Sequence, residues 1–350
     1  MAVTFPGFQN RIARLTVLDG SLDVSYLIGG KGPPLLLLHG FPQTKAIWHR
    51  IAPQLAQFYT VIAPDLRGYG ASSKPQSSPD HKTYSKKVMA ADQYSLMREL
   101  GFDQFFVLGH DRGARVAHRL AADYPQNVLK VMLLDISPTL TMYSQTTMAL
   151  AKGYWHWFFL IQSDPIPEKM IGADPEFWLK NHMGRYAGTS IFTPECWQEY
   201  LDSVSDPVCL HSMCEDYRAA ASIDLVDDQY DRDRKYKLSM PVHVLWGEYG
   251  LVNQCFNPLR DWADVAQRVT GHAVASGHYI PEEIPDVLMQ EAKEFFKLND
   301  ANGDGFISLD EAKNYAKKLC KHREVIFHQF ALGKTDGYKL LHVTKDLGNS

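Results

Sequence analysis

The chain is poor in cysteine, which accounts for only five of its 350 residues. An odd number of cysteines without the paired spacing of a zinc site predicts free thiols in a reducing compartment. Long apolar runs are missing as well. No segment approaches the ~20 apolar residues of a membrane span, and residues 1–15 lack the apolar core of a signal peptide. We therefore expect a cytoplasmic protein with no membrane partner.

An excess of positive charge is also lacking. Lysine and arginine together number 36 against 40 acidic residues, which gives a formal net charge of −4. Without a basic surface, we expect no nucleic-acid partner. No internal repeat recurs at a fixed period, which argues against a repeat architecture. The 45% hydrophobic content is enough to form a large core, and the length predicts one large domain with additions.

What the chain does have is an alternation of short apolar runs with amphipathic stretches. We expect strands at 11–29 (two strands turning at Asp19-Gly20), 34–38, 59–64, 104–108, 128–134, 241–246 and 270–275. We expect helices at 84–100, 114–124 and 282–298. Buried strands that alternate with helices predict an α/β fold with a mostly parallel sheet covered on both faces.

The alternation breaks after residue 138. About 100 residues rich in aromatic side chains, with proline-marked joints, separate the strand at 128–134 from the one at 241–246. We interpret residues 139–237 as a helical cap inserted into a core formed by residues 1–138 and 238–297. Residues 298–350 form a separate extension in this interpretation.

A tight turn follows the apolar strand at 104–108. It reads Gly109-His-Asp-Arg-Gly113 and leads directly into a helix, which is typical of a nucleophile elbow. The flanking glycines allow the chain to bend and to hold the central side chain at the end of the strand. That side chain is Asp111, a carboxylate already ionised at neutral pH, which needs no base to attack a saturated carbon.

An acid and a histidine follow Asp111 in the chain order of an α/β-hydrolase. Asp135 and His278 each come directly after a predicted strand, so both should lie at the sheet end that carries Asp111. Histidine titrates near neutral pH and suits a base that activates water, and a carboxylate behind it fixes the imidazole tautomer. Glu248, which follows a Trp-Gly pair, is the alternative acid. Backbone N–H groups of Phe41 and Arg112 are expected to form the oxyanion hole.

Arg112 and Arg115 indicate the charge of the substrate. Residues three apart share a face of a helix, so both guanidinium groups could lie beside Asp111. An anionic substrate attacked by an aspartate suffers a repulsion on the order of 4 kcal/mol at about 4 Å and an effective dielectric near 20. Two arginines offset this repulsion and can hold a carboxylate in a bidentate fork. A small anionic substrate is therefore expected.

Residues 300–311 read Asp-Ala-Asn-Gly-Asp-Gly-Phe-Ile-Ser-Leu-Asp-Glu, which matches an EF-hand calcium loop. The expected calcium ligands are Asp300, Asn302, Asp304, the Phe306 carbonyl, Ser308 through water, and Glu311. Residues 334–338 resemble a second loop that lacks acidic ligands. We expect one calcium site and no cofactor for catalysis.

Together these segments resemble the haloacetate dehalogenases of the α/β-hydrolase fold, including the members that cleave fluoroacetate. The resemblance covers residues 5–297 and implies an eight-stranded sheet and a homodimer. It rests on HGFPQT (39–44), DLRGYGASSKP (65–75), GHDRGARVAHR (109–119), LLDISPT (133–139), YWHWFFL (154–160), CEDYRAAASID (214–224) and SGHYIPEE (276–283).

The resemblance implies a role for each site residue. Asp111 would be the nucleophile, His278 the base and Asp135 its partner, and Arg112 and Arg115 would hold the substrate carboxylate. His156, Trp157 and Tyr217 of the cap would donate hydrogen bonds to the departing halide, an anion that needs donors in a dry pocket. Family members can carry a further pocket tryptophan, which the segment His182-Met-Gly-Arg-Tyr186 lacks.

Two other functions use the same features. An epoxide hydrolase shares the Asp/His chemistry, but it needs two cap tyrosines and usually has tryptophan where this chain has Arg112; the same difference disfavours a haloalkane dehalogenase. A non-catalytic, calcium-binding ligand sensor on a hydrolase scaffold is the third interpretation, and the intact set of Asp111, Asp135 and His278 argues against it.

Overall fold

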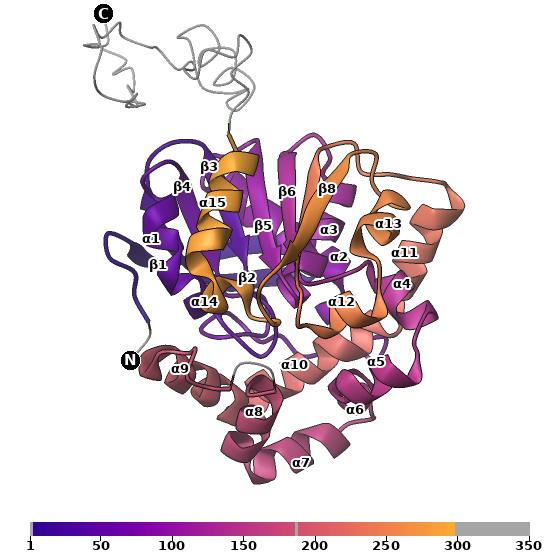
Figure 1. The fold of residues 1–350 in the computed structure, drawn as a ribbon. Helices are drawn as coiled ribbons and strands as arrows, with labels where there is room; N and C mark the ends of the chain where they lie inside the picture. The colour runs from indigo at the N-terminus through magenta and orange to yellow at the C-terminus, as the bar shows by residue number, and fades with distance from the viewer. Residues whose placement is uncertain (1–2, 186–187, 298–350) are drawn as a thin grey trace, which may run out of the picture.

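The computed structural model describes residues 3–185 and 188–297, which fold around an eight-stranded sheet (Figure 1). The spatial order is β1-β2-β4-β3-β5-β6-β7-β8. The first hairpin and its pairing with β4 are antiparallel, and all later pairs are parallel. The strands are β1 (Gln9–Val17), β2 (Gly20–Gly30), β3 (Pro34–Leu38), β4 (Thr60–Pro64), β5 (Phe105–His110), β6 (Val128–Leu134), β7 (Val242–Gly247) and β8 (Val269–Val274). The predicted mostly parallel sheet is confirmed.

Helices cover both faces of the sheet because alternate strand residues point in opposite directions. Leu35 and Leu37 of β3 pack with the face covered by α1 (Ala52–Leu55) and α15 (Pro285–Phe295). Leu36 and Leu38 belong to the other core cluster, with residues of α2 (Lys86–Glu99) and α3 (Arg112–Asp123). The central strand β3 is therefore apolar and buried along its whole length, as the sequence predicts for a sheet covered on both sides.

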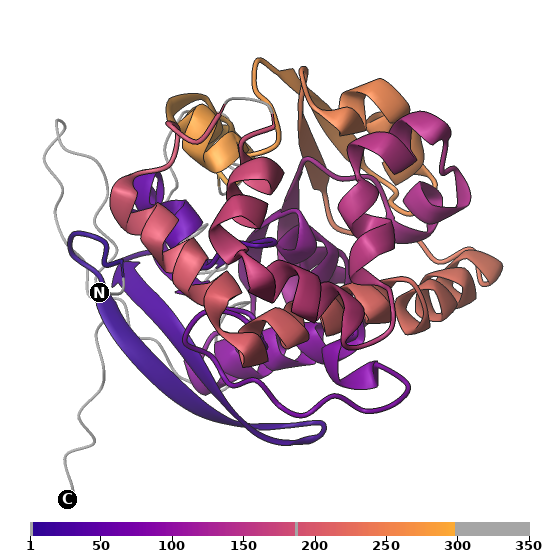
Figure 2. The same cartoon turned by 90° about the horizontal axis from the view of Figure 1, so that it is seen from below.

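Between β6 and β7 the structure describes eight helices, with residues 186–187 left aside. They are α4 (Thr139–Ser144), α5 (Met148–Gly153), α6 (Trp155–Leu160), α7 (Ile166–Ala173), α8 (Pro175–Met183), α9 (Pro194–Ser205), α10 (Pro207–Ala220) and α11 (Ile223–Asp233). Three begin with proline after a capping side chain, which is a standard start signal: Asp174, Thr193 and Asp206 each accept a bond from the first helical turn. Helices α6 to α10 gather at one end of the sheet, whereas α11 runs along its side near α13 (Figure 1), and the view from below looks onto the gathered helices (Figure 2).

The expected single helix at 282–298 is wrong, because two helices occupy this region. They are α14 (Ile280–Glu283) and α15 (Pro285–Phe295). Ile284 between them has φ −135° and ψ 56°, since the ring of the following proline disfavours the helical conformation for the residue before it. The remaining short helices are η1 (Lys45–Arg50), η2 (Lys82–Tyr84), α12 (Leu251–Cys255) and α13 (Pro258–Ala263).

The predicted calcium site and the predicted homodimer are not tested by these helices and strands. The predicted extension and its calcium ligands at 300–311 lie outside the described residues, and the homodimer stays a prediction. Across residues 3–185 and 188–297, no helix combines the length and the apolar character that spanning a bilayer requires.

Candidate active site

Asp111 stands at the sharp turn between β5 and α3. Its backbone has φ 48° and ψ −117°, a sparsely populated conformation that costs about 1–3 kcal/mol. Gly113 is required for close approach, because a Cβ there would lie 2.2 Å from the carbonyl oxygen of His39. The positive φ is at Asp111 and not at Gly113. The role of Gly113 is therefore to let the turn pack closely against the backbone of His39. The helix begins at Arg112, two residues earlier than expected.

Asp111, Asp135 and His278 meet at the ends of their strands, as their order in the chain predicts. The Nδ1 of His278 lies 2.6 Å from Oδ2 of Asp135, and its Nε2 lies 3.9 Å from Oδ2 of Asp111. The other oxygen of Asp135 accepts a bond of 2.9 Å from the N–H of Gly247. The alternative acid, Glu248, is exposed to solvent. The structure therefore brings Asp135 to the histidine.

The charges of these groups stabilise one another. Burial lowers the pKa of His278, but the hydrogen bond and charge of Asp135, with Asp111, raise it above its ordinary value. Burial raises the pKa of Asp111, but His278, Arg112 and Arg115 outweigh it, so the pKa of this carboxyl is lowered. Asp111 is consequently an ionised carboxylate at neutral pH, although it is only 5% exposed.

The loop after β3 contacts the nucleophile directly. Oδ1 of Asp111 accepts a hydrogen bond of 3.0 Å from the N–H of Phe41. His39 holds this loop in place: its Nε2 accepts from the N–H of Leu66 at 3.0 Å, and its Nδ1 donates to the Gly40 carbonyl at 3.0 Å. The N–H of Phe41 is thus oriented toward the Asp111 carboxylate, where charge would develop in an ester intermediate.

The two arginines on α3 are both buried, yet their surroundings differ. Arg112 makes three hydrogen bonds to Asp216 and lies over the ring of Tyr217 at 4.3 Å. Arg115 donates to the Ser137 carbonyl and the Thr139 hydroxyl and lies 4.8 Å from the ring of Trp157. Within the described residues Arg115 forms no ion pair with a carboxylate, and Nη1 of Arg112 and Nε of Arg115 are buried without a hydrogen-bond partner.

Cap side chains close the site from above the nucleophile. His156, Trp157 and Tyr217 are all buried. The ring of Tyr217 lies 5.9 Å from that of His156 and 6.4 Å from that of Trp157. Burial lowers the pKa of His156 far below its ordinary value, so the imidazole is neutral and can donate through one N–H. Its Nδ1 is buried without a partner among the described residues. The three residues named from the resemblance therefore lie together.

Sequence reasoning missed two further members of this aromatic group. Trp178 of α8 stacks on His182 at 4.8 Å, and His182 contacts His156 at 4.5 Å. Both Trp178 and His182 also contact Phe41. Trp178 precedes His182 by four residues, so helical spacing from a pocket residue is the signal that could have identified it. The cap thus supplies a tryptophan from outside the segment where the resemblance expected one.

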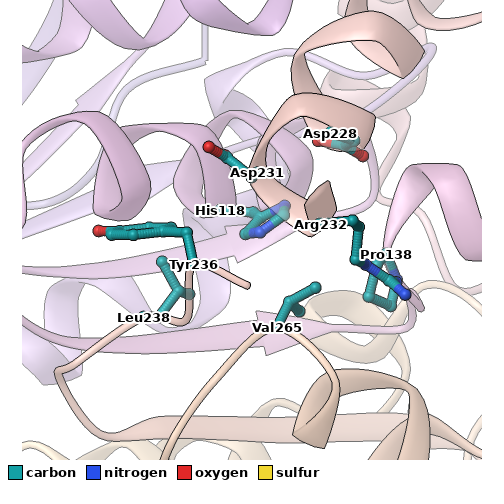
Figure 3. A pocket seen from close by; sticks show the side chains of 8 residues that line it. All are labelled: His118, Pro138, Asp228, Asp231, Arg232, Tyr236, Leu238 and Val265. Carbon is teal, nitrogen blue, oxygen red and sulfur yellow. The ribbon is translucent and has the colours of Figure 1, made fainter. Parts of the chain in front are cut away.

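A small cavity lies next to the arginine-bearing helix but apart from the nucleophile. It is enclosed by α3, α11 and the loops beside them, with His118, Asp228 and Arg232 among its lining residues (Figure 3). Its volume is about 10 Å³, enough for about one water molecule. Burial lowers the pKa of His118 to about 3, so this imidazole is uncharged. The cavity is too small for an organic substrate.

Three groups of side chains in the described part of the chain bring three potential metal-ligand atoms within 4.8 Å of one another. They are His49/Cys196/Glu282, His243/His272/Glu291 and Asp164/Glu168/His211. None of these groups includes Asp111, Asp135 or His278.

Comparison with known proteins agrees with this fold. The family model described as "alpha/beta hydrolase fold" matches residues 33–283. The chain is 42% identical to fluoroacetate dehalogenase from Burkholderia sp., over 85% of this chain and 96% of that protein. It is 33% identical to soluble epoxide hydrolase from Corynebacterium sp. (strain C12), over 77% of this chain and 92% of that protein.

A solved structure of an α/β hydrolase from Nostoc sp. PCC 7120 superposes with a TM-score of 0.81 at 47% identity, covering 84% of this chain and 99% of that one. The similarity therefore extends over nearly the whole length of each relative. The chain belongs to the α/β-hydrolase fold family.

Proposed function

We propose that the protein is a hydrolytic dehalogenase that converts short haloacetates, such as fluoroacetate and chloroacetate, to glycolate and halide. Asp111 is the nucleophile in this proposal, His278 the base and Asp135 the partner of the base. Arg112 and Arg115 bind the substrate carboxylate, while His156, Trp157 and Tyr217 receive the halide.

The observation that carries the proposal is the pair of buried arginines. Arg115 is buried and its hydrogen bonds within the described residues go to neutral groups, so the charge of Asp111 acts on it only from a distance. Arg112 and Arg115 each retain a buried nitrogen without a hydrogen-bond partner. A substrate carboxylate would supply hydrogen-bond acceptors for both nitrogens. A neutral substrate would leave them as they are.

The first chemical step is displacement at carbon. Oδ1 of Asp111 is held by the N–H of Phe41, so Oδ2 is the oxygen free to attack. It forms a bond to the carbon that carries the halogen, and the carbon–halogen bond breaks with both electrons leaving on the halide. Donors on His156, Trp157 and Tyr217 stabilise that anion. The carboxylate contacts orient the carbon and supply part of the rate enhancement.

The second step hydrolyses the ester on Asp111. The Nε2 of His278 takes a proton from water, and the resulting hydroxide attacks the ester carbonyl carbon. The carbonyl oxygen is Oδ1, which already faces the N–H of Phe41, and the N–H of Arg112 is the second donor in this proposal. The tetrahedral intermediate collapses when the bond between the Asp111 carbonyl carbon and Oδ2 breaks, and the departing oxygen takes the proton from His278 to give glycolate. The new carboxyl group of Asp111 then releases its proton to solvent. Asp135 stabilises the imidazolium that forms.

Epoxide hydrolysis is the second candidate, and the cap tyrosines favour it. Burial and the nearby charge of Asp111 both raise the pKa of Tyr217. The ring of Tyr154 lies 6.2 Å from that of His278. Two tyrosine hydroxyls could protonate an epoxide oxygen. The buried charge of Arg115 favours an anionic substrate over a neutral epoxide.

One experiment separates the two candidates. Purified protein is given fluoroacetate, chloroacetate and a neutral epoxide, and release of halide and of diol is measured beside an Asp111→Asn control. We expect halide from both acids and none from the control. Diol formation without halide release would reject the dehalogenase proposal and leave the nucleophile assignment standing.

A further inference from the structure

Behind Arg112 lies a buried cluster of charges that the proposed mechanism does not use. Asp216 of α10 is fully buried and binds three side chains from three other segments. Arg112 donates to it through Nε and Nη2, the hydroxyl of Tyr69 donates at 2.7 Å, and the ammonium of Lys86 forms an ion pair with it. Lys86 also lies 3.8 Å from Asp224. The cluster therefore joins α2, α3, the loop after β4 and the cap.

These contacts fix the orientation of Arg112. Nε and Nη2 are both taken by Asp216, with Nη2 also donating to the Asp216 carbonyl at 2.8 Å. One face of the guanidinium is covered by the ring of Tyr217 at 4.3 Å. Among the described residues, Nη1 of Arg112 has no hydrogen-bond partner. Asp216 thus acts as a clamp that leaves a single edge of Arg112 available to a ligand.

The clamp creates an electrostatic difficulty that Lys86 resolves. If Asp216 faced Arg112 alone, its negative charge would cancel the charge that Arg112 offers to a substrate carboxylate. Lys86 shares the same carboxylate, so Asp216 is divided between two cations. Burial raises the pKa of Asp216, but Arg112 and Lys86 outweigh it and lower this pKa, so the group is an anion.

The charge of Lys86 needs its own argument because the side chain is only 3% exposed. Burial and the neighbouring Arg112 outweigh Asp216 and Asp224, so the pKa of Lys86 lies below its ordinary value. Its ammonium contacts Asp216 directly and its backbone N–H donates to Asp224 at 2.8 Å. With two carboxylates on it and one other cation nearby, the charged form is the one these contacts support.

We propose that Asp216 is the positioning residue for Arg112, and that Lys86 determines specificity at a distance by keeping Arg112 available to an anionic substrate. This inference rests on the proposed function, since it assumes that Arg112 binds a carboxylate. It predicts that the preference for acids over neutral analogues depends on a lysine that does not touch the substrate.

The test is Lys86→Met, which removes the charge and keeps an unbranched side chain. Lys87→Met is the matched control, because Lys87 is the next residue on α2 and its side chain is 56% exposed. The KM and kcat for halide release are measured with chloroacetate and with chloroacetamide, a neutral molecule of similar shape. Circular dichroism verifies that each variant is folded.

We expect Lys86→Met to raise the KM for chloroacetate roughly tenfold, the effect of losing one unit charge about 10 Å away at an effective dielectric near 20. The KM for chloroacetamide and both KM values of Lys87→Met should stay within about threefold of wild type, a split that a purely structural role of Lys86 would not produce. A folded Lys86→Met variant with an unchanged ratio of the two KM values would overturn the inference.

The double variant Lys86→Met/Asp216→Asn keeps the test decisive if the single variant does not fold. The double variant removes the ion pair of Lys86 and Asp216 as a unit, and Asp224 keeps its hydrogen bond from the backbone N–H of residue 86. In the double variant, no carboxylate at position 216 cancels the charge of Arg112. We therefore expect the KM for chloroacetate to return to within about threefold of wild type. The kcat should be lower, because asparagine holds Arg112 less firmly than aspartate does. A double variant with an acid preference about tenfold weaker would contradict the inference. Wild-type protein that releases no halide would instead contradict the proposed function.

Discussion

The sheet end and the cap contribute to the site in different ways. Asp111, Asp135 and His278 lie at strand ends and are held by backbone contacts, such as the bond from Gly247 to Asp135 and that from His110 to the His278 carbonyl. The cap contributes aromatic and imidazole side chains held mainly by ring packing. In the proposed mechanism, the sheet would carry the bond-making steps and the cap would select the leaving group. Changes in the sheet should lower the rate for every substrate, whereas changes in the cap should reorder substrates.

The strongest test of this division is Asp111→Asn. A neutral amide cannot form the ester, so halide release from every haloacetate should fall by on the order of 10⁴ or more. Halide release is followed with an ion-selective electrode, with Asp111→Ala as a second variant that cannot revert by deamidation. Activity within tenfold of wild type in the alanine variant would reject covalent catalysis by this residue.

Asp135→Asn should affect the second step more than the first. The asparagine cannot stabilise the imidazolium, so ester hydrolysis should slow by on the order of 10³–10⁴. The ester should therefore accumulate on the peptide that contains residue 111, where mass spectrometry of protein quenched with chloroacetate would detect the added carboxymethyl group. Slow turnover with no adduct would mean that alkylation, rather than hydrolysis, depends on Asp135.

Arg115 tests the border between the two regions, because it comes from α3 but lies against Trp157 of the cap. Replacing it with glutamine removes a buried charge that has no carboxylate partner in the described structure. We expect kcat/KM for chloroacetate to fall about 10²–10³-fold, as for the loss of a charge-assisted bidentate contact, and that for chloroacetamide to change much less. Equal losses on both substrates would assign Arg115 a structural role.

The pH dependence reports on the base of the sheet end. Asp135 and Asp111 raise the pKa of His278 above its ordinary value against the effect of burial, and the base acts only when it is neutral. Activity should therefore fall about tenfold per pH unit below a midpoint above ~6.5, and level off above it. The base acts after the carbon–halogen bond has broken, so this midpoint should appear in kcat, and the loss of the Asp111 charge in the ester should place it below the pKa of His278 in the free enzyme. A profile that is flat from pH 5 to 9 would contradict this assignment.

The sheet end was predictable from sequence because its signals are local. A buried strand followed by Gly-His-Asp-Arg-Gly identifies the turn at Asp111, and Asp135 and His278 likewise follow apolar runs. Chain order then brings them together, since the carboxyl ends of parallel strands share one edge of the sheet. The break between α14 and α15 was missed although Pro285 signals it.

The cluster behind Arg112 was not predictable in this way. Asp216 lies 104 residues from Arg112 and 130 residues from Lys86 in the chain. Nothing in the pattern around Lys86 distinguishes it from Lys87, yet one side chain is buried and the other is exposed. Such pairings depend on how the cap helices pack against the sheet domain. Periodicity and composition do not determine that packing.

The smallest expected effect lies in the cap and concerns the choice of halogen. His156→Gln replaces the imidazole with an amide donor that has a shorter reach to the leaving group. Trp155→Phe is the matched control, because Trp155 is the preceding residue and is 41% exposed. Fluoride concentrates its charge most and depends most on hydrogen bonds, so the ratio of fluoroacetate to chloroacetate kcat/KM should fall about three- to tenfold in the glutamine variant alone. Equal losses for both acids would mean that His156 shapes the pocket without contacting the halide, and the leaving-group role would then rest on Trp157 and Tyr217.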